Sequence, residues 1–203
     1  MLKLDHIAIA AETLEEGRAY VESALGVDLQ PGGQHGHYGT HNMLLGQEDG
    51  LYLEVIAVDP DAPKPDYPRW FDLDRFSGTP RIGNWICRSD DVVATVADLP
   101  QAGTPVALSR GIVRWTMAVP PNGQLPYDNC FPALMQWQSS PTPPEVLPAS
   151  GCRLTRLVIR HPDASQLNTD LAAYLDDPRV VYEVGSAGII AHFDTPSGSK
   201  VLR

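Results

Sequence analysis

Short segments of alternating apolar and polar residues, typical of strands, recur along this chain and are separated by a few segments with helical spacing. Residues 2–10 alternate and are rich in aliphatic side chains, which predicts a strand. A helix is predicted to begin at Thr13, because Thr13-x-x-Glu16 has the form of a capping box. Gly26 is suited to a C-terminal cap, so the helix is expected to end there.

Further strands complete the pattern of the first 58 residues. Two are predicted at residues 40–45 and 51–58, joined by a short polar turn. A less regular strand is expected near residues 27–30, followed by a turn at the Pro-Gly-Gly sequence of residues 31–33. This part of the chain therefore predicts the order β, α, β, β, β.

The same order returns after residues 59–80, a segment rich in proline and aromatic residues. That segment is expected to be a long crossover over one edge of the core, either as a packed connector or as a lid over a pocket. The second copy is predicted to contain a strand, a helix and three strands, at residues 81–88, 92–99, 106–109, 113–119 and 133–138. A third copy is predicted at residues 153–160, 164–175, 180–184 and 188–194, and it is expected to be incomplete around its last strand.

Internal repetition of a mixed unit predicts a fold more strongly than any single element does. Overlaying the first two copies places Leu4-Asp5-His6 on Ile82-Gly83-Asn84 and Tyr52-Leu53-Glu54 on Leu134-Met135-Gln136. The chain is therefore predicted to be one α+β domain, residues 1–203, built from tandem βαβββ modules. Its predicted parts are module one (1–58), the crossover (59–80), module two (81–138), a proline-rich linker (139–150) and a partial third module (151–203).

Composition narrows the range of partners and compartments. The chain has 25 acidic and 15 basic residues, a net charge of −10 and no cluster of Lys and Arg, which argues against nucleic acid and membrane as partners. Its three cysteines match neither a disulfide framework nor a zinc knuckle, and its N-terminus lacks the features of a signal peptide. No window approaches the roughly 20 apolar residues of a membrane span. A soluble, cytoplasmic protein is the expectation.

Several motifs at corresponding positions are similar to those of one superfamily. They are Leu4-Asp5-His6 on the first strand, Tyr52-Leu53-Glu54 on the fourth, Gly39-Thr40-His41-Asn42 leading the third, and Ser89-Asp90-Asp91 at a helix start. The chain resembles the glyoxalase-like branch of the vicinal-oxygen-chelate (glyoxalase/bleomycin resistance/dihydroxybiphenyl dioxygenase) superfamily. The resemblance implies a curved mixed sheet around a small-molecule pocket, and it makes a homodimer a candidate assembly. It does not fix the activity, because this scaffold serves isomerases, lyases, dioxygenases, resistance proteins and binders.

His6 and Glu54 are the first candidates for chemistry, because each is a polar residue in apolar company on a predicted strand. The family carries metal ligands on these strands, so the resemblance implies that both residues point at one site and hold a divalent ion such as Zn, Fe, Mn or Ni. The second copy offers Asn84 and Gln136 instead, and carboxamides bind transition metals weakly. The four residues are therefore predicted to bind substrate, with or without a metal. Alternatively, they form a buried hydrogen-bonded network without an ion.

Two further groups are candidate pocket residues. His35, His37 and His41 surround a glycine-rich turn, where they form either a chelating cluster or an ordinary surface group. His41 and Asn42 are the better candidates for substrate binding because they belong to the family-like motif, although adjacent strand residues face opposite ways. Arg110 is predicted to anchor a substrate carboxylate or phosphate through its planar guanidinium.

Trp85 and Trp137 each follow a proposed site residue, so alternation directs them to the opposite face of the sheet, where a role in the core is predicted. The sequence has no nucleophile elbow, Walker A loop, dinucleotide fingerprint or His-Glu-x-x-His motif, which disfavours nucleotide-driven and serine-hydrolase chemistry. The leading prediction is a small-molecule enzyme of the glyoxalase or dioxygenase kind, with Glu54 as ligand or general base and His6 as ligand or proton partner. The alternative is a non-catalytic protein that sequesters a small ligand in the same cup.

Overall fold

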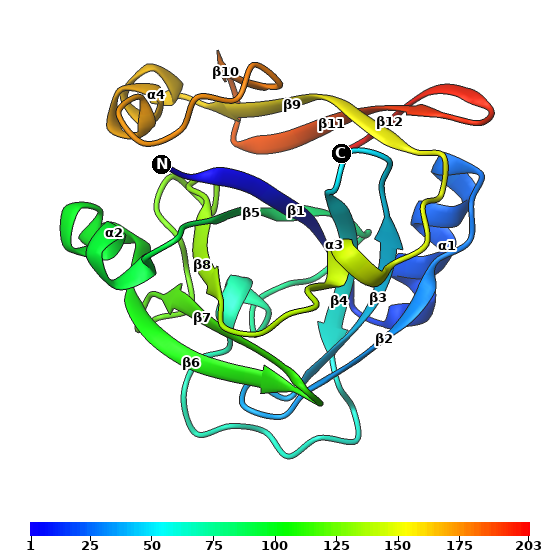
Figure 1. The fold of residues 1–203 in the computed structure, drawn as a ribbon, viewed down its shortest axis with the longest axis horizontal. Helices are drawn as coiled ribbons and strands as arrows, with labels where there is room; N and C mark the ends of the chain where they lie inside the picture. Colours follow the sequence, from blue (N-terminus) through cyan, green and yellow to red (C-terminus); the bar gives the residue numbers. More distant parts are fainter.

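Two βαβββ modules form one curved sheet of eight strands (Figure 1). The computed structural model describes all residues, 1–203. Module one contains β1 (Lys3–Ala10), α1 (Leu14–Leu25), β2 (Gln30–His35), β3 (Thr40–Gly46) and β4 (Tyr52–Val58). Module two contains β5 (Arg81–Arg88), α2 (Val92–Asp98), the short turn η2 (Pro100–Ala102), β6 (Thr104–Arg110), β7 (Val113–Val119) and β8 (Ala133–Trp137). The predicted α+β fold of tandem modules is confirmed.

The strand order is β2-β3-β4-β1-β5-β8-β7-β6, so the modules join where β1 and β5 pair antiparallel at the centre. The sheet curls until its edge strands, β2 and β6, contact each other without hydrogen-bonded pairing. It therefore has a concave inner face and a convex outer face (Figure 1).

The register of the central strands decides which side chains belong to the inner face. His6 on β1 lies opposite Ile86 on β5, and Ala8 lies opposite both Glu54 on β4 and Asn84 on β5. Paired residues of a sheet point to the same side, and successive residues of a strand alternate. These five side chains therefore share one face, which is the inner one because His6 and Glu54 line a cavity there.

The outer face of the central strands is large and apolar, and a second sheet covers it. Ile7, Ile9 and Trp85 point outward and are 0% exposed. A strand that is apolar on both faces needs cover on both, because burial of apolar surface is the main favourable term in folding. The cover over β1 and β5 consists of β9 (Arg153–His161), β10 (Val180–Val184), β11 (Gly188–Thr195) and β12 (Gly198–Leu202), with the helix α4 (Ala164–Leu171) (Figure 1).

The strands of this C-terminal sheet are connected in a different order from those of the two modules before it. Its order is β10-β9-β11-β12, with β10 parallel to β9 and directly beside it. In module one the strand that follows the helix, β2, lies instead at the far edge of the sheet. The C-terminal segment has the predicted order of a strand, a helix and two strands, and it adds the unpredicted strand β12, which pairs with β11 through a tight turn. The C-terminal sheet neither completes the cup nor plugs it.

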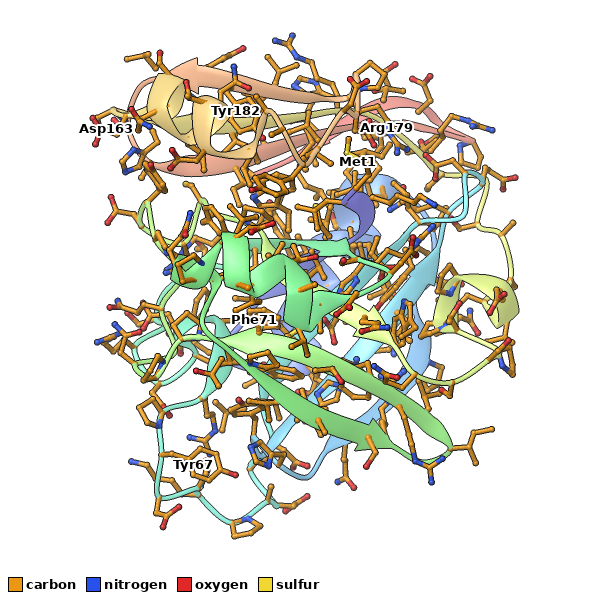
Figure 2. All side chains as sticks on the ribbon, turned by 60° about the vertical axis from the view of Figure 1, so that its left-hand side comes forward. Met1, Tyr67, Phe71, Asp163, Arg179 and Tyr182 are labelled. Carbon is orange, nitrogen blue, oxygen red and sulfur yellow. The ribbon has the colours of Figure 1, made fainter.

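The segments between modules are short helical turns and loops. The linker contains the helix α3 (Pro143–Val146), and the crossover contains the turn η1 (Trp70–Asp72). Within the crossover, Phe71 lies inside the molecule, 7% exposed, whereas Tyr67 lies at its edge, 40% exposed (Figure 2). The rings of Trp70 and Phe71 stack with centroids 5.0 Å apart. The crossover is thus a packed connector that also contributes aromatic side chains to the inner face.

The first helix is capped as its sequence predicts. The backbone N–H of Glu16 donates to Thr13 Oγ1 at 3.2 Å, and Gly26 takes the left-handed conformation at φ 73°. None of the helices combines the length and apolar character that crossing a bilayer requires.

Strand β2 lies further along the chain than predicted, and the Pro-Gly-Gly sequence is inside the strand rather than in a turn. Its register against β3 shifts between Pro31 and Gln34, as at a β-bulge. A Cβ at Gly32 would lie 2.0 Å from Asn42 Oδ1 and 2.5 Å from Asn42 O. The glycine therefore gives the Asn42 side chain the room it occupies on the inner face.

We expect Gly32→Ala to lower the free energy of unfolding by about 1–3 kcal/mol, because an extra methyl group forced into packed atoms costs this much. Urea denaturation followed by circular dichroism measures the change. Gly36→Ala is the matched control in the same hairpin, since a Cβ there meets nothing within 4 Å. Wild-type stability of the Gly32→Ala protein would contradict the role assigned to Gly32.

Candidate functional site

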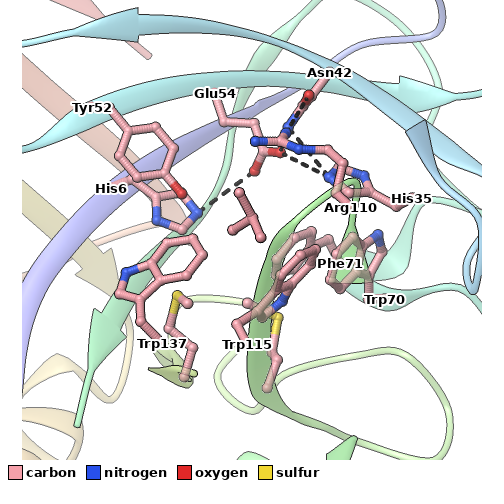
Figure 3. Close-up of a pocket in the computed structure, with 13 residues that line it drawn as sticks. His6, His35, Asn42, Tyr52, Glu54, Trp70, Phe71, Arg110, Trp115 and Trp137 are labelled. Carbon is pink, nitrogen blue, oxygen red and sulfur yellow. Dashed lines mark hydrogen bonds and ion pairs between the residues drawn. The ribbon is translucent and has the colours of Figure 1, made fainter. Parts of the chain in front are cut away.

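A cavity opens on the inner face of the large sheet (Figure 3). Its lining residues come from every strand of that sheet except β5, and from the crossover. They are His6, His35, Asn42, Tyr52, Glu54, Trp70, Phe71, Arg110, Val113, Trp115, Met117, Met135 and Trp137. The cavity volume is about 30 Å³, which is space for about two water molecules. Only a compact ligand, or one that displaces lining side chains, fits here.

One wall of the cavity is polar and the other is apolar (Figure 3). The polar wall consists of His6, His35, Asn42, Glu54 and Arg110. The apolar wall is mainly aromatic, and the rings of Trp115 and Trp137 lie edge to face with centroids 6.0 Å apart. An aromatic wall excludes water, so the charges opposite it interact more strongly than they would in solvent.

His6 is held between two carboxylates. Its Nδ1 lies 2.8 Å from Asp5 Oδ1, and its Nε2 lies 3.6 Å from Glu54 Oε2. A register shift between Leu4 and His6 in the pairing with β5 brings the adjacent Asp5 to the same imidazole. Burial opposes charge on His6, but the contacts with Asp5 and Glu54 outweigh it and raise the pKa above the ordinary value of 6.5. His6 therefore keeps its second proton to higher pH than a free imidazole does.

Glu54 is an ionised carboxylate at neutral pH. Burial would raise its pKa, but the interaction with His6 and the other donors around it outweigh burial and lower the pKa to about 2. The side-chain amide of Asn42 donates to Glu54 Oε1 in a short hydrogen bond. Glu54 is 5% exposed, so its charge is compensated by these donors rather than by water.

The hydrogen bonds of Asn42 fix the tautomer of His35. Asn42 Oδ1 accepts from the Gly33 N–H and from Arg110 NH1, both at 2.8 Å, so its amide nitrogen must face Glu54 and His35 Nε2. His35 Nε2 then accepts, at 3.3 Å, and His35 Nδ1–H donates to Thr40 Oγ1 at 3.0 Å. His35 is thus a neutral imidazole, and both of its ring nitrogens are hydrogen-bonded.

Burial lowers the pKa of His35 to about 4 from the ordinary value of 6.5. Between these values the unfolded chain binds a proton at His35 that the folded chain does not, so stability falls as the pH falls through this window. The contribution of His35 is on the order of 3 kcal/mol. Glu54 adds a further loss below its ordinary pKa of 4.5, because its folded pKa is about 2.

We expect His35→Phe to flatten the pH dependence of unfolding between pH 6.5 and 4 relative to wild type. Denaturant titrations at a series of pH values measure this difference, with His37→Phe, in the same hairpin but exposed, as the control for loss of a histidine. An unchanged slope in the His35→Phe protein would contradict a buried neutral His35.

Arg110 crosses the seam between the two edges of the sheet. It lies on β6, and its hydrogen bond to Asn42 on β3 joins the modules where β2 and β6 are not paired. Its stem passes over β2 at Gly33, where a Cβ would lie 2.7 Å from Arg110 Cδ. Arg110 lines the cavity and forms no ion pair with a carboxylate of the protein.

The structure brings together four of the residues predicted to form the site: His6, Asn42, Glu54 and Arg110 all line the cavity. His41 lies on the other side of β3, because it is adjacent to Asn42 in a regular strand.

Asn84 and Gln136 do not line the cavity. Asn84 faces inward but is buried beyond the cavity, 1% exposed, and neither atom of its amide has a partner. Gln136 points outward, where its Oε1 accepts from the Val92 N–H at 3.2 Å and its Nε2 donates to Asp90 O at 2.6 Å. Placing Gln136 in the cup is therefore wrong, and the residue instead caps the start of α2.

The prediction for Gln136 fails because the sequence overlay of β4 on β8 is shifted by one residue. Ile86 pairs with Ala133 and Arg88 pairs with Met135, so the inward face of β8 carries Met135 and Trp137. The prediction that Trp137 lies in the core on the opposite face is wrong. The prediction for Trp85 is confirmed, since its indole N–H donates to Cys130 O at 2.8 Å on the outer side.

The sequence places His35 only in a cluster around a turn, and it does not reveal Asp5 or the aromatic wall. His35 is buried at the end of β2, where the sequence pattern predicts a glycine-rich turn. The crossover was expected to be a connector or a lid, and Trp70 and Phe71 are its two contributions to the cavity. A useful signal for them is the clustering of large aromatic residues in a segment that has no strand or helix of its own.

The donor set around the cavity does not fit a divalent metal. Such ions need several deprotonated side chains that converge on one point. Nowhere does the structure bring three or more His, Cys, Asp or Glu residues together in that way. Module two contributes Met135 and Trp137 at this face, and the nearby Arg110 is a positive charge that opposes cation binding.

Comparisons with known proteins agree with this fold. Residues 4–175 match the family described as a glyoxalase-like domain. No curated protein matches the chain significantly. Among solved structures, a hypothetical protein from Staphylococcus aureus is 16% identical with a TM-score of 0.63, over 93% of this chain and 88% of that one. A methylmalonyl-CoA epimerase from Mycobacterium tuberculosis is 21% identical with a TM-score of 0.45, over 68% of this chain and 88% of that one.

Proposed function

Because the chain belongs to the glyoxalase-like domain family, we propose that its cavity binds a compact organic anion that contains a carbonyl group, and moves a proton at the carbon next to that carbonyl. The observation that carries this proposal is the pair formed by Glu54 and His6. Both side chains are almost fully buried, and they face each other at 3.6 Å across a cavity with an aromatic wall.

Arg110 supports an anionic ligand. Its guanidinium reaches the cavity with one donor committed to Asn42 and with no carboxylate of the protein as a partner. A partly buried guanidinium offers a planar fork that matches a carboxylate in two hydrogen bonds. A ligand carboxylate at this position would compensate the charge of Arg110.

Glu54 and His6 support proton transfer. Their separation of 3.6 Å is longer than a normal hydrogen bond, so a ligand oxygen that moves the two side chains apart breaks only a weak direct contact. Glu54 takes a proton from the carbon, and the electron pair of the broken C–H bond forms a C=C bond. The negative charge moves to the carbonyl oxygen, where His6 Nε2–H donates to it. Return of the proton to either face of the carbon restores the carbonyl.

Binding of the ligand is expected to raise the low pKa of Glu54. The interaction with His6 is the strongest of the contacts that lower this pKa to about 2. A ligand oxygen that accepts from His6 competes for that interaction, and the dry aromatic wall opposes charge on Glu54. Both effects raise the basicity of Glu54 when the ligand is bound, which is when a base is needed.

Incubation with a panel of small oxo-carboxylates in D2O tests the proposal, because exchange of a carbon-bound proton for deuterium is visible by proton NMR whatever the final product is. We expect at least one member to lose its α-proton signal at a rate proportional to protein concentration. Oxo-carboxylates that bind but never exchange would overturn the catalytic part of the proposal.

The second candidate function is capture of the same anion without chemistry. Two observations favour it: the low pKa of Glu54, about 2, makes it a weak base, and Asn84 is a buried amide on the inner face without a partner in the protein. Buried amides are nearly always hydrogen-bonded, so Asn84 would pair with a polar group of a ligand that reaches beyond the cavity lining. Saturable binding with no deuterium incorporation is the result that distinguishes capture from catalysis.

A further inference from the structure

We propose that Asp5 is the positioning residue of this site: it holds the proton on His6 Nδ1 and fixes the orientation of Trp137 at the same time, without touching the ligand. The inference deepens the proposed function, since it concerns the proton donor of the same cavity. Asp5 is 0% exposed and does not line the cavity. It therefore acts only through the residues that it contacts.

Each carboxylate oxygen of Asp5 has its own partners. Oδ1 faces His6 Nδ1 at 2.8 Å. Oδ2 accepts from Trp137 Nε1 and from Arg88 NH1, both at 3.0 Å. Asp5 thus ties together β1, β5 and β8, and two of its three partners line the cavity.

These contacts decide what His6 and Trp137 present to a ligand. A carboxylate only accepts hydrogen bonds, so His6 Nδ1 must carry a proton, and Nε2 is the atom left facing Glu54. Trp137 donates its only N–H to Asp5, so the part of its ring that faces the cavity is apolar. The division between polar and apolar walls therefore depends in part on one residue behind them.

The β-bulge is what makes this arrangement available. In a regular strand Asp5 and His6 would point to opposite faces, and their side chains would not meet. The register of β1 against β5 shifts between Leu4 and His6, and Asp5 has no paired residue on β5. Bulges of this kind reorient single side chains and occur next to functional sites.

Asp5→Asn is the decisive variant because it keeps the shape and removes one acceptor. Trp137 and Arg88 are both donors, so they hold the amide oxygen on their side, and the amide nitrogen faces His6. His6 Nδ1 must then accept, so His6 changes from the imidazolium form, protonated on both ring nitrogens between Asp5 and Glu54, to the neutral Nε2–H tautomer, which is a weaker proton donor. The nitrogen-15 chemical shifts of the His6 imidazole report the tautomer directly.

In the wild-type protein, we expect a protonated Nδ1 whose proton exchanges slowly with solvent. In Asp5→Asn, we expect the Nε2–H tautomer, together with a fall in the deuterium-exchange kcat of roughly 10–100-fold and little change in KM. Asp90→Asn, an exposed aspartate, is the control and should behave as wild type.

An unprotonated Nδ1 in wild-type protein at neutral pH would overturn the inference without any variant, which covers the case in which Asp5→Asn does not fold. Retention of the proton on Nδ1 in a folded Asp5→Asn protein would also overturn it. The NMR result does not need turnover, so loss of the Nδ1 proton in an Asp5→Asn protein whose wild type shows no exchange activity would support the role of Asp5 and count against the proposed reaction alone.

Discussion

Glu54→Gln is expected to slow deuterium incorporation by about 10²–10⁴-fold, the usual contribution of a positioned general base. Glutamine has the size of glutamate but no basic carboxylate. Its amide oxygen can still accept from Asn42, and its nitrogen can donate to His6 if His6 is neutral, so the fold should be spared. Proton NMR of the substrate in D2O measures the rate.

Two controls make the Glu54 result specific. Glu15→Gln removes an exposed glutamate on α1 and should leave the rate unchanged. The thermal unfolding of Glu54→Gln and of the wild type should each show a single cooperative transition. Exchange at the wild-type rate in folded Glu54→Gln protein would rule out Glu54 as the base.

Arg110→Gln is expected to weaken binding of a carboxylate ligand by roughly 30-fold or more, about 2 kcal/mol, since loss of one partner of a partly desolvated charge pair costs at least this much. The binding of a matched carboxamide, which carries no charge, should change much less. Isothermal titration of both ligands against wild type and variant separates charge recognition from general loss of packing.

Arg114→Gln is the matched control for Arg110, because Arg114 lies on the neighbouring strand β7 but is exposed. Arg110→Lys should be intermediate, since it keeps the charge without the planar fork. Equal loss of carboxylate and carboxamide binding in Arg110→Gln would show that Arg110 supports the seam between the sheet edges and does not recognise an anion.

The fold could be predicted because its signal is spread over many residues. Two copies of the same element order, with caps such as Thr13 and Gly26 at helix ends, agree even where single strands are misplaced. The C-terminal sheet shows the limit of this reasoning. Its element order repeats, but β10 pairs directly with β9. Which strand edge β10 pairs with is decided by the tertiary structure, and no local sequence pattern predicts it.

The site was harder to predict because a shift of one residue along a strand moves a side chain to the opposite face of the sheet. On β8 a shift of one position exchanges Gln136 for Trp137, and the loop before it takes left-handed backbone at Tyr127, Asp128 and Asn129, which sequence spacing does not reveal. The bulges at Asp5 and in β2 act in the same way. Glu54, on a regular stretch of β4, keeps the face that simple alternation assigns to it.

The central claim is that the His6–Glu54 pair moves a proton without a metal ion. Deuterium incorporation into the best oxo-carboxylate, measured before and after exhaustive treatment with a chelator and with elemental analysis of the same samples, tests it most directly. We expect an unchanged rate in metal-free protein and loss of that rate in Glu54→Gln. A rate that disappears with the metal and returns when Zn, Fe, Mn or Ni is added would contradict it.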